Sequence, residues 1–230
     1  MSFAASGGWG VGQRLDDVPG AEGDAAGAQK KTLHATERDT PRVRALRGHF
    51  KKRVAAVDPA KLVFVDESGI NTSMTRTRGR AAPGERVQGA VPQGHWKTLT
   101  MIGALRLEGM AAAVTVDAAT DTDVFGAFVH DALVPALHPG DVVLWDGLAP
   151  HKAQQMQRQI EQAQARLIPL PPYSPDLSPI EPGWSKVKGH VRDVAPRTAE
   201  ALGQAAAEGF ANVTAADARG WFKKCGYCVH

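Results

Sequence analysis

Two short apolar runs, each followed at once by an aspartate, constrain the fold of this chain more than any other feature. Residues 62–65 precede Asp66, and residues 142–145 precede Asp146. Continuous apolar runs of this length are typical of strands that are buried on both faces. If the two strands lie parallel and adjacent, both carboxylates emerge at the same edge of the sheet, where open α/β sheets place their sites. For either aspartate alone, a turn or a helix cap is the more common explanation.

The other elements expected from the sequence alternate around these two runs. Thr40 is a plausible N-cap, and apolar residues at helical spacing predict an amphipathic helix over residues 41–57. Residues 95–117 predict two strands joined around Glu108 and Gly109. Further helices are expected over residues 122–137 and 152–165, after the stretch around Glu181, and as two segments within residues 198–225. A third short strand is expected over residues 165–170. This order implies a mixed sheet with helices on its faces, an α/β fold.

Charge and glycine content divide the chain into three predicted segments. Residues 1–29 contain seven glycines, one Arg and four acidic residues without apolar periodicity, and are expected to be disordered or extraneous. Residues 30–60 carry nine Lys and Arg against three acidic residues and are expected to form a basic linker helix. This segment suits a polyanionic partner, and a solvated helix face explains it equally well. Residues 61–230 form the main domain.

Membrane insertion and secretion are not expected. No apolar run reaches the roughly 18 residues of a membrane span, and the first residues do not form a secretory signal. Cys225 and Cys228 are the two cysteines in the sequence, which excludes a disulfide framework and favours a reducing cytoplasm. With one CxxC pair and no second cluster, a frayed tail is favoured over a metal site.

The stretch YSPDLSPIEPGWSK contains two more acids, Asp176 and Glu181. Asp176 is interpreted as a turn residue whose carboxylate satisfies backbone donors. Ser178 and Glu181 have the spacing of a capping box, and alternatively the helix begins at Pro182. In both cases Glu181 lies at a helix N-terminus, where the dipole favours the ionised carboxylate that a hard metal needs. A glutamate that only caps the helix is the competing interpretation.

The motifs VDESG, LWDGLAPHKA and PPYSPDLSPIEPGWSKVK together resemble the catalytic domain of bacterial insertion-sequence transposases of the mariner-type (Tc/mariner) superfamily. The resemblance extends over about residues 30–227, and the third motif is the most specific. The 34 residues between Asp146 and Glu181 match the spacing typical of this group. Members are DDE endonucleases, so the resemblance implies a ribonuclease-H-like mixed β-sheet flanked by helices for residues 61–230.

The resemblance also implies the chemistry. Asp66, Asp146 and Glu181 would be the catalytic residues and would bind two divalent ions, Mg²⁺ or Mn²⁺, for phosphodiester cleavage and strand transfer at the ends of an insertion element. DNA, both element ends and target, would be the partner. A homodimer and a cytoplasmic, nucleoid-associated location in a bacterium are further expectations of the family, with no membrane involved.

Cationic residues near these motifs are predicted to contact DNA. Lys188 and Arg192 share the helical face of Glu181, where they would meet phosphates. Loop and strand-end residues expected to contact the backbone are Arg76, Arg78, Arg80, His95 and Lys97. His151 occupies a position where the family commonly has a histidine, and is predicted to position the substrate or to make a local hydrogen bond. Gly147 stands where many members have Asn.

One departure from the family concerns its N-terminal helix-turn-helix region, which recognises the element ends. Residues 1–29 do not resemble it, so we expect a truncated, non-autonomous transposase product. Two alternatives keep the same residues: a metal-dependent nuclease that does not transpose, and a DNA-binding remnant without catalysis. A two-carboxylate glycosidase fits less well, because the cations around Glu181 suit phosphate better than sugar.

Overall fold

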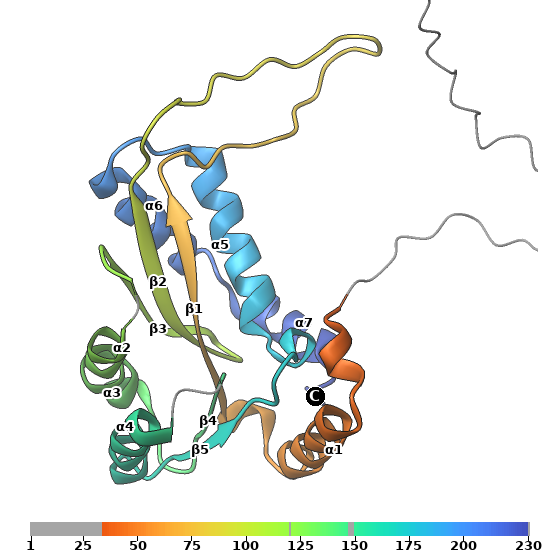
Figure 1. Cartoon of the computed structure of the whole chain (residues 1–230), viewed down its shortest axis with the longest axis vertical. Helices are drawn as coiled ribbons and strands as arrows, with labels where there is room; N and C mark the ends of the chain where they lie inside the picture. The colour runs from red at the N-terminus through yellow and green to blue at the C-terminus, as the bar shows by residue number, and fades with distance from the viewer. Residues whose placement is uncertain (1–33, 120, 147–149, 230) are drawn as a thin grey trace, which may run out of the picture. The chain divides into compact units, whose positions relative to one another are not determined.

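A five-stranded sheet organises the residues that the structure, a computed structural model, describes: 34–119, 121–146 and 150–229 (Figure 1). Its strand order is β3-β2-β1-β4-β5. At its centre β1 (Leu62–Asn71) pairs parallel with β4 (Val142–Trp145), and β5 (Arg166–Pro169) extends this parallel part. The predicted hairpin, β2 (Thr98–Arg106) and β3 (Gly109–Val116), pairs antiparallel on the other side of β1. The mixed sheet is therefore confirmed.

Side chains alternate along each strand, so the apolar strands present buried side chains on both faces of the sheet. Helices cover both faces. On one face Leu62 and Phe64 share a core with α5 (Ile180–Val194), α6 (Ala199–Ala211) and α7 (Ala215–Lys224). On the other face Val63 and Val65 pack with a second set of helices. These are α2 (Thr122–Phe128), a π-helical turn (Val129–Leu133), α3 (Val134–Ala136) and α4 (Pro150–Gln162). No described helix has the length and apolar character needed to cross a membrane.

The basic helix α1 (Pro41–Ala55) begins as predicted, two residues shorter than expected. The Thr40 side chain accepts a hydrogen bond from the Val43 N–H, and Pro41 occupies the first helical position, where its missing N–H costs nothing. Phe50 and Val54 are buried in the α5-side core. The helix therefore packs against the sheet domain along an apolar stripe. The predicted segment 1–29 lies outside the described residues.

Strand β1 is longer than the sequence indicated. We expected it to end at Asp66, but residues 66–71 continue in antiparallel register with β2. The expectation was wrong because Asp66 and Gly69 are poor strand formers by themselves, whereas the neighbouring β2 supplies hydrogen-bond partners. Pairing with β4 stops at Val65 and Trp145. Beyond that point one edge of β1 lacks a strand neighbour, and the candidate site lies there.

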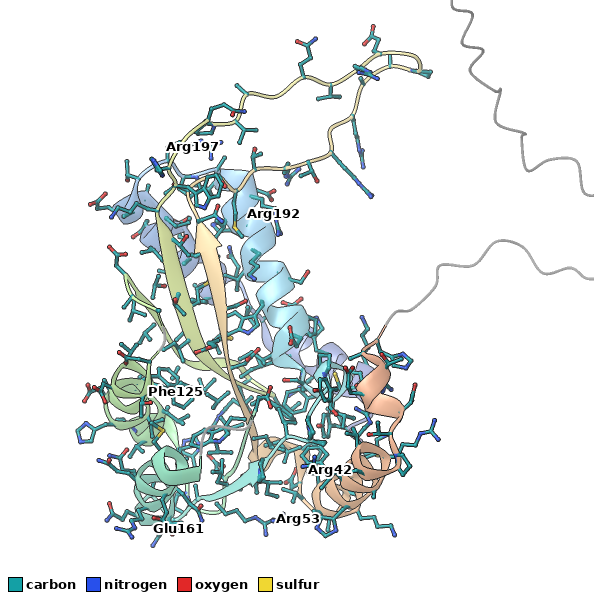
Figure 2. All side chains as sticks on the ribbon, in the orientation of Figure 1. Arg42, Arg53, Phe125, Glu161, Arg192 and Arg197 are labelled. Atoms are coloured by element: carbon teal, nitrogen blue, oxygen red, sulfur yellow. The ribbon has the colours of Figure 1, made fainter. Side chains whose placement is uncertain are left out.

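Residues 72–97 connect β1 to β2 as a long exposed loop that extends away from the sheet (Figure 1). Its base is tied to the region after α5. Arg197, labelled with Arg192 near this base in Figure 2, donates hydrogen bonds to the carbonyl oxygens of Thr72 at 2.9 Å and Met74 at 3.1 Å. The loop is thus anchored at one end while its tip is surrounded by solvent.

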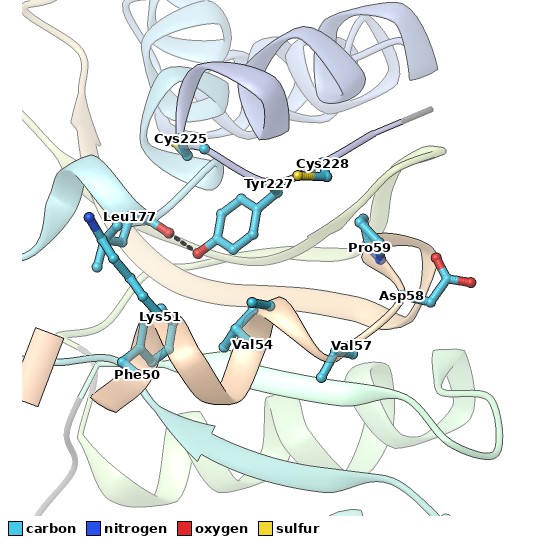
Figure 3. Close-up of a pocket in the computed structure, with 12 residues that line it drawn as sticks. Phe50, Lys51, Val54, Val57, Asp58, Pro59, Leu177, Cys225, Tyr227 and Cys228 are labelled. Atoms are coloured by element: carbon cyan, nitrogen blue, oxygen red, sulfur yellow. Dashed lines mark hydrogen bonds between the residues drawn. The ribbon is translucent and has the colours of Figure 1, made fainter. Parts of the chain in front are cut away.

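The C-terminal segment is docked rather than frayed, so that prediction was wrong. The Tyr227 hydroxyl donates a hydrogen bond to the Leu177 carbonyl at 2.6 Å (Figure 3). Its ring lies 5.2 Å from the Phe64 ring and 5.7 Å from the Phe222 ring, between centroids. Aromatic packing of this kind stabilises a tail that polar neighbours alone would not hold. Cys225 and Cys228 are free thiols.

Candidate active site

Three carboxylates from three elements line one cavity of about 320 Å³. Asp66 lies within β1, Asp146 directly follows β4, and Glu181 lies in the first turn of α5. Since Val65 pairs with Trp145, Asp66 and Asp146 follow at equivalent positions of two parallel neighbours. The arrangement expected from the two apolar runs is therefore present. The catalytic roles of the three residues remain predictions.

The two-residue period of a strand decides which acids face the cavity. Phe64 and Leu144 pack on the α5 side of the sheet. Asp66 and Asp146 follow two residues later, so they face the same side. Glu67 is exposed and has the opposite phase. Glu67 does not line the cavity.

Glu181 reaches the cavity without a capping box. Helix α5 begins at Ile180, and Pro179 occupies the N-cap position with no side-chain cap hydrogen bond. The Glu181 N–H donates to the Ser178 carbonyl at 3.2 Å, while Ser178 is buried in the cavity wall. Both predicted starts were wrong, because Pro179 itself can take the helical conformation at the cap. The carboxylate still lies at the helix N-terminus, where the dipole favours negative charge.

Trp184 orients Asp66, which sequence reasoning missed. The indole Nε1–H donates to Asp66 Oδ2 at 2.9 Å, and the ring is buried in the core. Gly103 lies opposite Asp66 on β2, and a Cβ there would come within 2.8 Å of the Trp184 ring. Gly103 therefore leaves the space that the indole needs. The available signal was the spacing of Trp184, three residues after Glu181 and so close to its face of the helix.

Burial and like charges perturb the acids of the cavity. Burial raises the pKa of Asp66, and the negative charges of Glu67 and Asp146 add to this, while the Trp184 hydrogen bond opposes it. Burial also raises the pKa of Glu181, as does the charge of Asp66, and Lys188 lowers it. Carboxylates brought together in a partly dry cavity are typical of functional sites, because a bound cation relieves their repulsion.

The donor set fits hard divalent cations, which prefer carboxylate oxygens. Among the described residues, no three His, Cys, Asp or Glu side chains surround a single ion position. Within the cavity, the negative charge of Asp146 contributes to the raised pKa of Asp66, and the charge of Asp66 contributes to the raised pKa of Glu181.

Two of the predicted DNA-contacting residues continue from the cavity along α5. Lys188 is half-buried, and its pKa is lowered by burial and by the charge of Arg192, against the opposing effect of Glu181 and Asp66. Arg192 lies one turn further along the same helix. The side chain of His151 lies outside the described part of the structure.

The predicted loop cations lie apart from the cavity. Arg76 forms an ion pair with Asp193 of α5, so this side chain is engaged within the protein. Arg78 and Arg80 are exposed in the loop, and Lys97 is exposed at its far end. None of these four cations is among the residues that line the cavity. Their contact with DNA remains a prediction.

Comparison with known proteins gives a family match and several structural matches. The sequence profile of the DDE superfamily endonuclease family matches residues 61–203, more than half of the chain. The search of curated protein sequences gives no significant match.

Solved structures of the Mos1 mariner transposase are similar in fold. The Mos1 paired-end complex with Mn aligns with a TM-score of 0.67 and 19% identity, covering 89% of this chain and 64% of that chain. The Mos1 paired-end complex with the left transposon end aligns with a TM-score of 0.64 and 18% identity, covering 87% and 64%. The chain thus spans slightly less than two thirds of the length of these relatives.

The Mos1 catalytic domain, solved with raltegravir and Mn, aligns with a TM-score of 0.59 and 15% identity over 84% of this chain and 94% of that one. The five-stranded mixed sheet with its flanking helices is the ribonuclease-H-like fold of that domain, which confirms the predicted fold class. Because the profile match extends over more than half of its residues, the chain belongs to the DDE superfamily of endonucleases.

Proposed function

We propose that this chain is the catalytic domain of a mariner-type DNA transposase, which cleaves phosphodiester bonds at element ends and transfers the freed strand to target DNA. The observation that carries the proposal is the presence of Asp66, Asp146 and Glu181 in one cavity. The similarity in fold to a transposase solved with transposon ends supports it. Action as a homodimer and a cytoplasmic, nucleoid-associated location in a bacterium belong to the same proposal.

Asp66, Asp146 and Glu181 would hold two divalent ions. When bound, Mg²⁺ or Mn²⁺ would supply the charge that activates a water or a 3′-hydroxyl and stabilises the leaving oxygen. Trp184 fixes the orientation of Asp66 through its hydrogen bond. Lys188, half-buried beside Glu181, provides a cation for the phosphate group.

The rest of the cavity wall comes from the proline-rich segment after β5. Leu170, Pro171 and Pro172 line the cavity together with the three acids. Proline side chains are apolar and their backbone lacks an N–H donor, so the two prolines add no backbone donor to this wall. The residues of the chain therefore orient Asp66 and provide a cation for the phosphate group.

The test uses supercoiled plasmid and duplexes that carry the inverted repeats flanking the coding sequence. With Mg²⁺ or Mn²⁺ we expect nicks that leave 3′-hydroxyl ends, followed by joined products. Asp146→Ala should reduce cleavage roughly a thousandfold, since a metal site contributes several kcal/mol to the barrier, and should retain DNA binding. The matched control is Asp117→Ala, an exposed aspartate that does not line the cavity.

The alternatives give different outcomes in the same assay. Cleavage without any joined product would favour a nuclease that does not transpose. DNA binding without metal-dependent cleavage by the unmodified chain would favour a DNA-binding remnant. Cleavage that survives Asp146→Ala would contradict the assignment of the site.

A further inference from the structure

A buried arginine of α1 contacts the segment that leads to Glu181. Arg47 is 8% exposed, and its guanidinium donates through Nη1 to Ser174 Oγ at 2.6 Å and to Asp176 Oδ1 at 3.0 Å. Nη2 donates to Asp176 Oδ2 at 2.7 Å. This two-point contact between guanidinium and carboxylate is the strongest and most directional form of an ion pair. Asp176 is therefore more than the turn residue that we predicted, because it joins two elements 129 residues apart in sequence.

On the upstream side, the contact of Arg47 extends to the wall of the cavity. Ser174 is buried, accepts from Arg47 and donates its own hydroxyl to the Pro172 carbonyl at 3.0 Å. Pro172 and Ser174 both line the cavity. Between them Tyr173 has φ of +55°, a left-handed conformation that is unfavourable for a residue with a side chain. Such a conformation persists when the surroundings hold it, and Arg47 supplies one hydrogen bond to the adjacent Ser174 and two to Asp176.

On the downstream side, the chain from Asp176 to Glu181 has little freedom. Pro175 and Pro179 fix their own φ angles, and Leu177 is buried with its carbonyl bonded to Tyr227. A change in the position of Asp176 is therefore transmitted to the first turn of α5 instead of being absorbed by a flexible linker.

We propose that Arg47 is a positioning residue of the active site: through Ser174 and Asp176 it sets where Glu181 stands relative to Asp66 and Asp146. Arg47 lines no part of the cavity, so it acts through the segment and not on the substrate. The inference rests on the proposed function, because it assigns Arg47 a role in metal binding by those carboxylates. It also gives α1 a function distinct from that of a basic linker.

A purely structural ion pair makes a different prediction. Loss of Arg47 would then lower the stability of the fold and leave the affinity of the folded protein for metal unchanged. A positioning role predicts weaker metal binding by protein that is still folded. Residues that support metal ligands typically change metal affinity by about tenfold to a hundredfold when they are removed.

The experiment titrates Mn²⁺ into DNA-free protein by calorimetry and compares Arg47→Gln with Arg44→Gln. Both substitutions remove one positive charge from α1, but Arg44 is exposed and pairs loosely with Asp39 at 3.7 Å. We expect Arg47→Gln to weaken Mn²⁺ binding by about tenfold or more, and Arg44→Gln to leave the affinity within twofold. Excess Mn²⁺ should restore most of the cleavage rate of Arg47→Gln, since Arg47 touches no reacting atom.

Circular dichroism establishes whether each variant is folded. Folded Arg47→Gln with unchanged Mn²⁺ affinity overturns the inference. If Arg47→Gln does not fold, Asp176→Asn decides by the same criterion, because it keeps the shape of the side chain and the contact between Arg47 and Ser174. Failure of both to fold shows a structural role and also overturns it. Absence of Mn²⁺ binding by the unmodified chain contradicts the proposed function itself, before any variant is compared.

Discussion

Strand β4 has an aspartate at each end, and the two differ in environment. Asp141, just before the strand, is fully buried, and its Oδ2 accepts from Arg106 Nη2 at 2.7 Å and from the His138 N–H at 2.8 Å. Asp146, just after the strand, is exposed and lines the cavity with two other acids. The first carboxylate is paired with a cation in the protein interior, whereas the second lines a cavity together with Asp66 and Glu181. Acids gathered in one cavity are suited to bind a cation.

The largest expected effect is the difference in stability between substitutions at the two ends of β4. Asp141→Asn should lower the free energy of unfolding by about 3–5 kcal/mol, because it leaves the Arg106 charge buried without its counter-ion. Asp146→Asn should change it by less than about 0.5 kcal/mol, as for most exposed positions. Urea denaturation of both variants measures the difference. Equal losses would mean that Asp146 also holds the fold together.

A smaller effect is expected where the site meets the core, at Gly103. Gly103→Ala should cost about 1–3 kcal/mol, because the added methyl group would lie 2.6 Å from the Met110 Cε and 2.8 Å from the Trp184 ring in a packed interior. It should also weaken Mn²⁺ binding, since Trp184 orients Asp66.

Gly69→Ala on β1 is the matched control for this change, because a Cβ there meets nothing within 4 Å. Thermal unfolding and Mn²⁺ titration of both variants test the prediction. If Gly103→Ala lowers stability and leaves the Mn²⁺ affinity unchanged, the hydrogen bond from the Trp184 indole does not influence metal binding.

The smallest effect concerns an aspartate that is paired at the surface. A hydrogen bond from Lys186 and two from Thr214 lower the pKa of Asp217 to about 2. Because the folded pKa is lower than the unfolded value, this carboxylate stabilises the fold above about pH 4 and ceases to do so as the pH falls towards 2. Asp217→Asn should remove that part of the acid dependence. Acid unfolding curves that coincide for the two proteins would contradict the expectation.

Much of the fold could be predicted because local patterns and tertiary contacts agree. The apolar runs before Asp66 and Asp146, the hairpin around Gly109 and the amphipathic stripe of α1 each form the expected element. The end of β1 could not be predicted, because its last residues are held by hydrogen bonds to β2 and not by their own preferences.

The three acids of the candidate site could be predicted from the sequence. The residues that orient them could not. Asp66 and Asp146 follow apolar runs and Glu181 lies at a helix start, all of which are local signals. The orienting hydrogen bond of Trp184 and the space left by Gly103 depend on contacts of α5 with β1 and β2, which have no local signature. The same holds for Arg47, whose partners are more than 120 residues away in sequence.

The sequence by itself determined which elements form and which acids follow the apolar runs, because side-chain periodicity and proline geometry act over a few residues. Only the tertiary structure decided which groups surround each carboxylate. Asp141 and Asp146 flank the same apolar run, yet the first meets Arg106 across the sheet and the second meets Asp66 at an open edge. The surroundings of a carboxylate depend on partners that folding brings from distant parts of the chain.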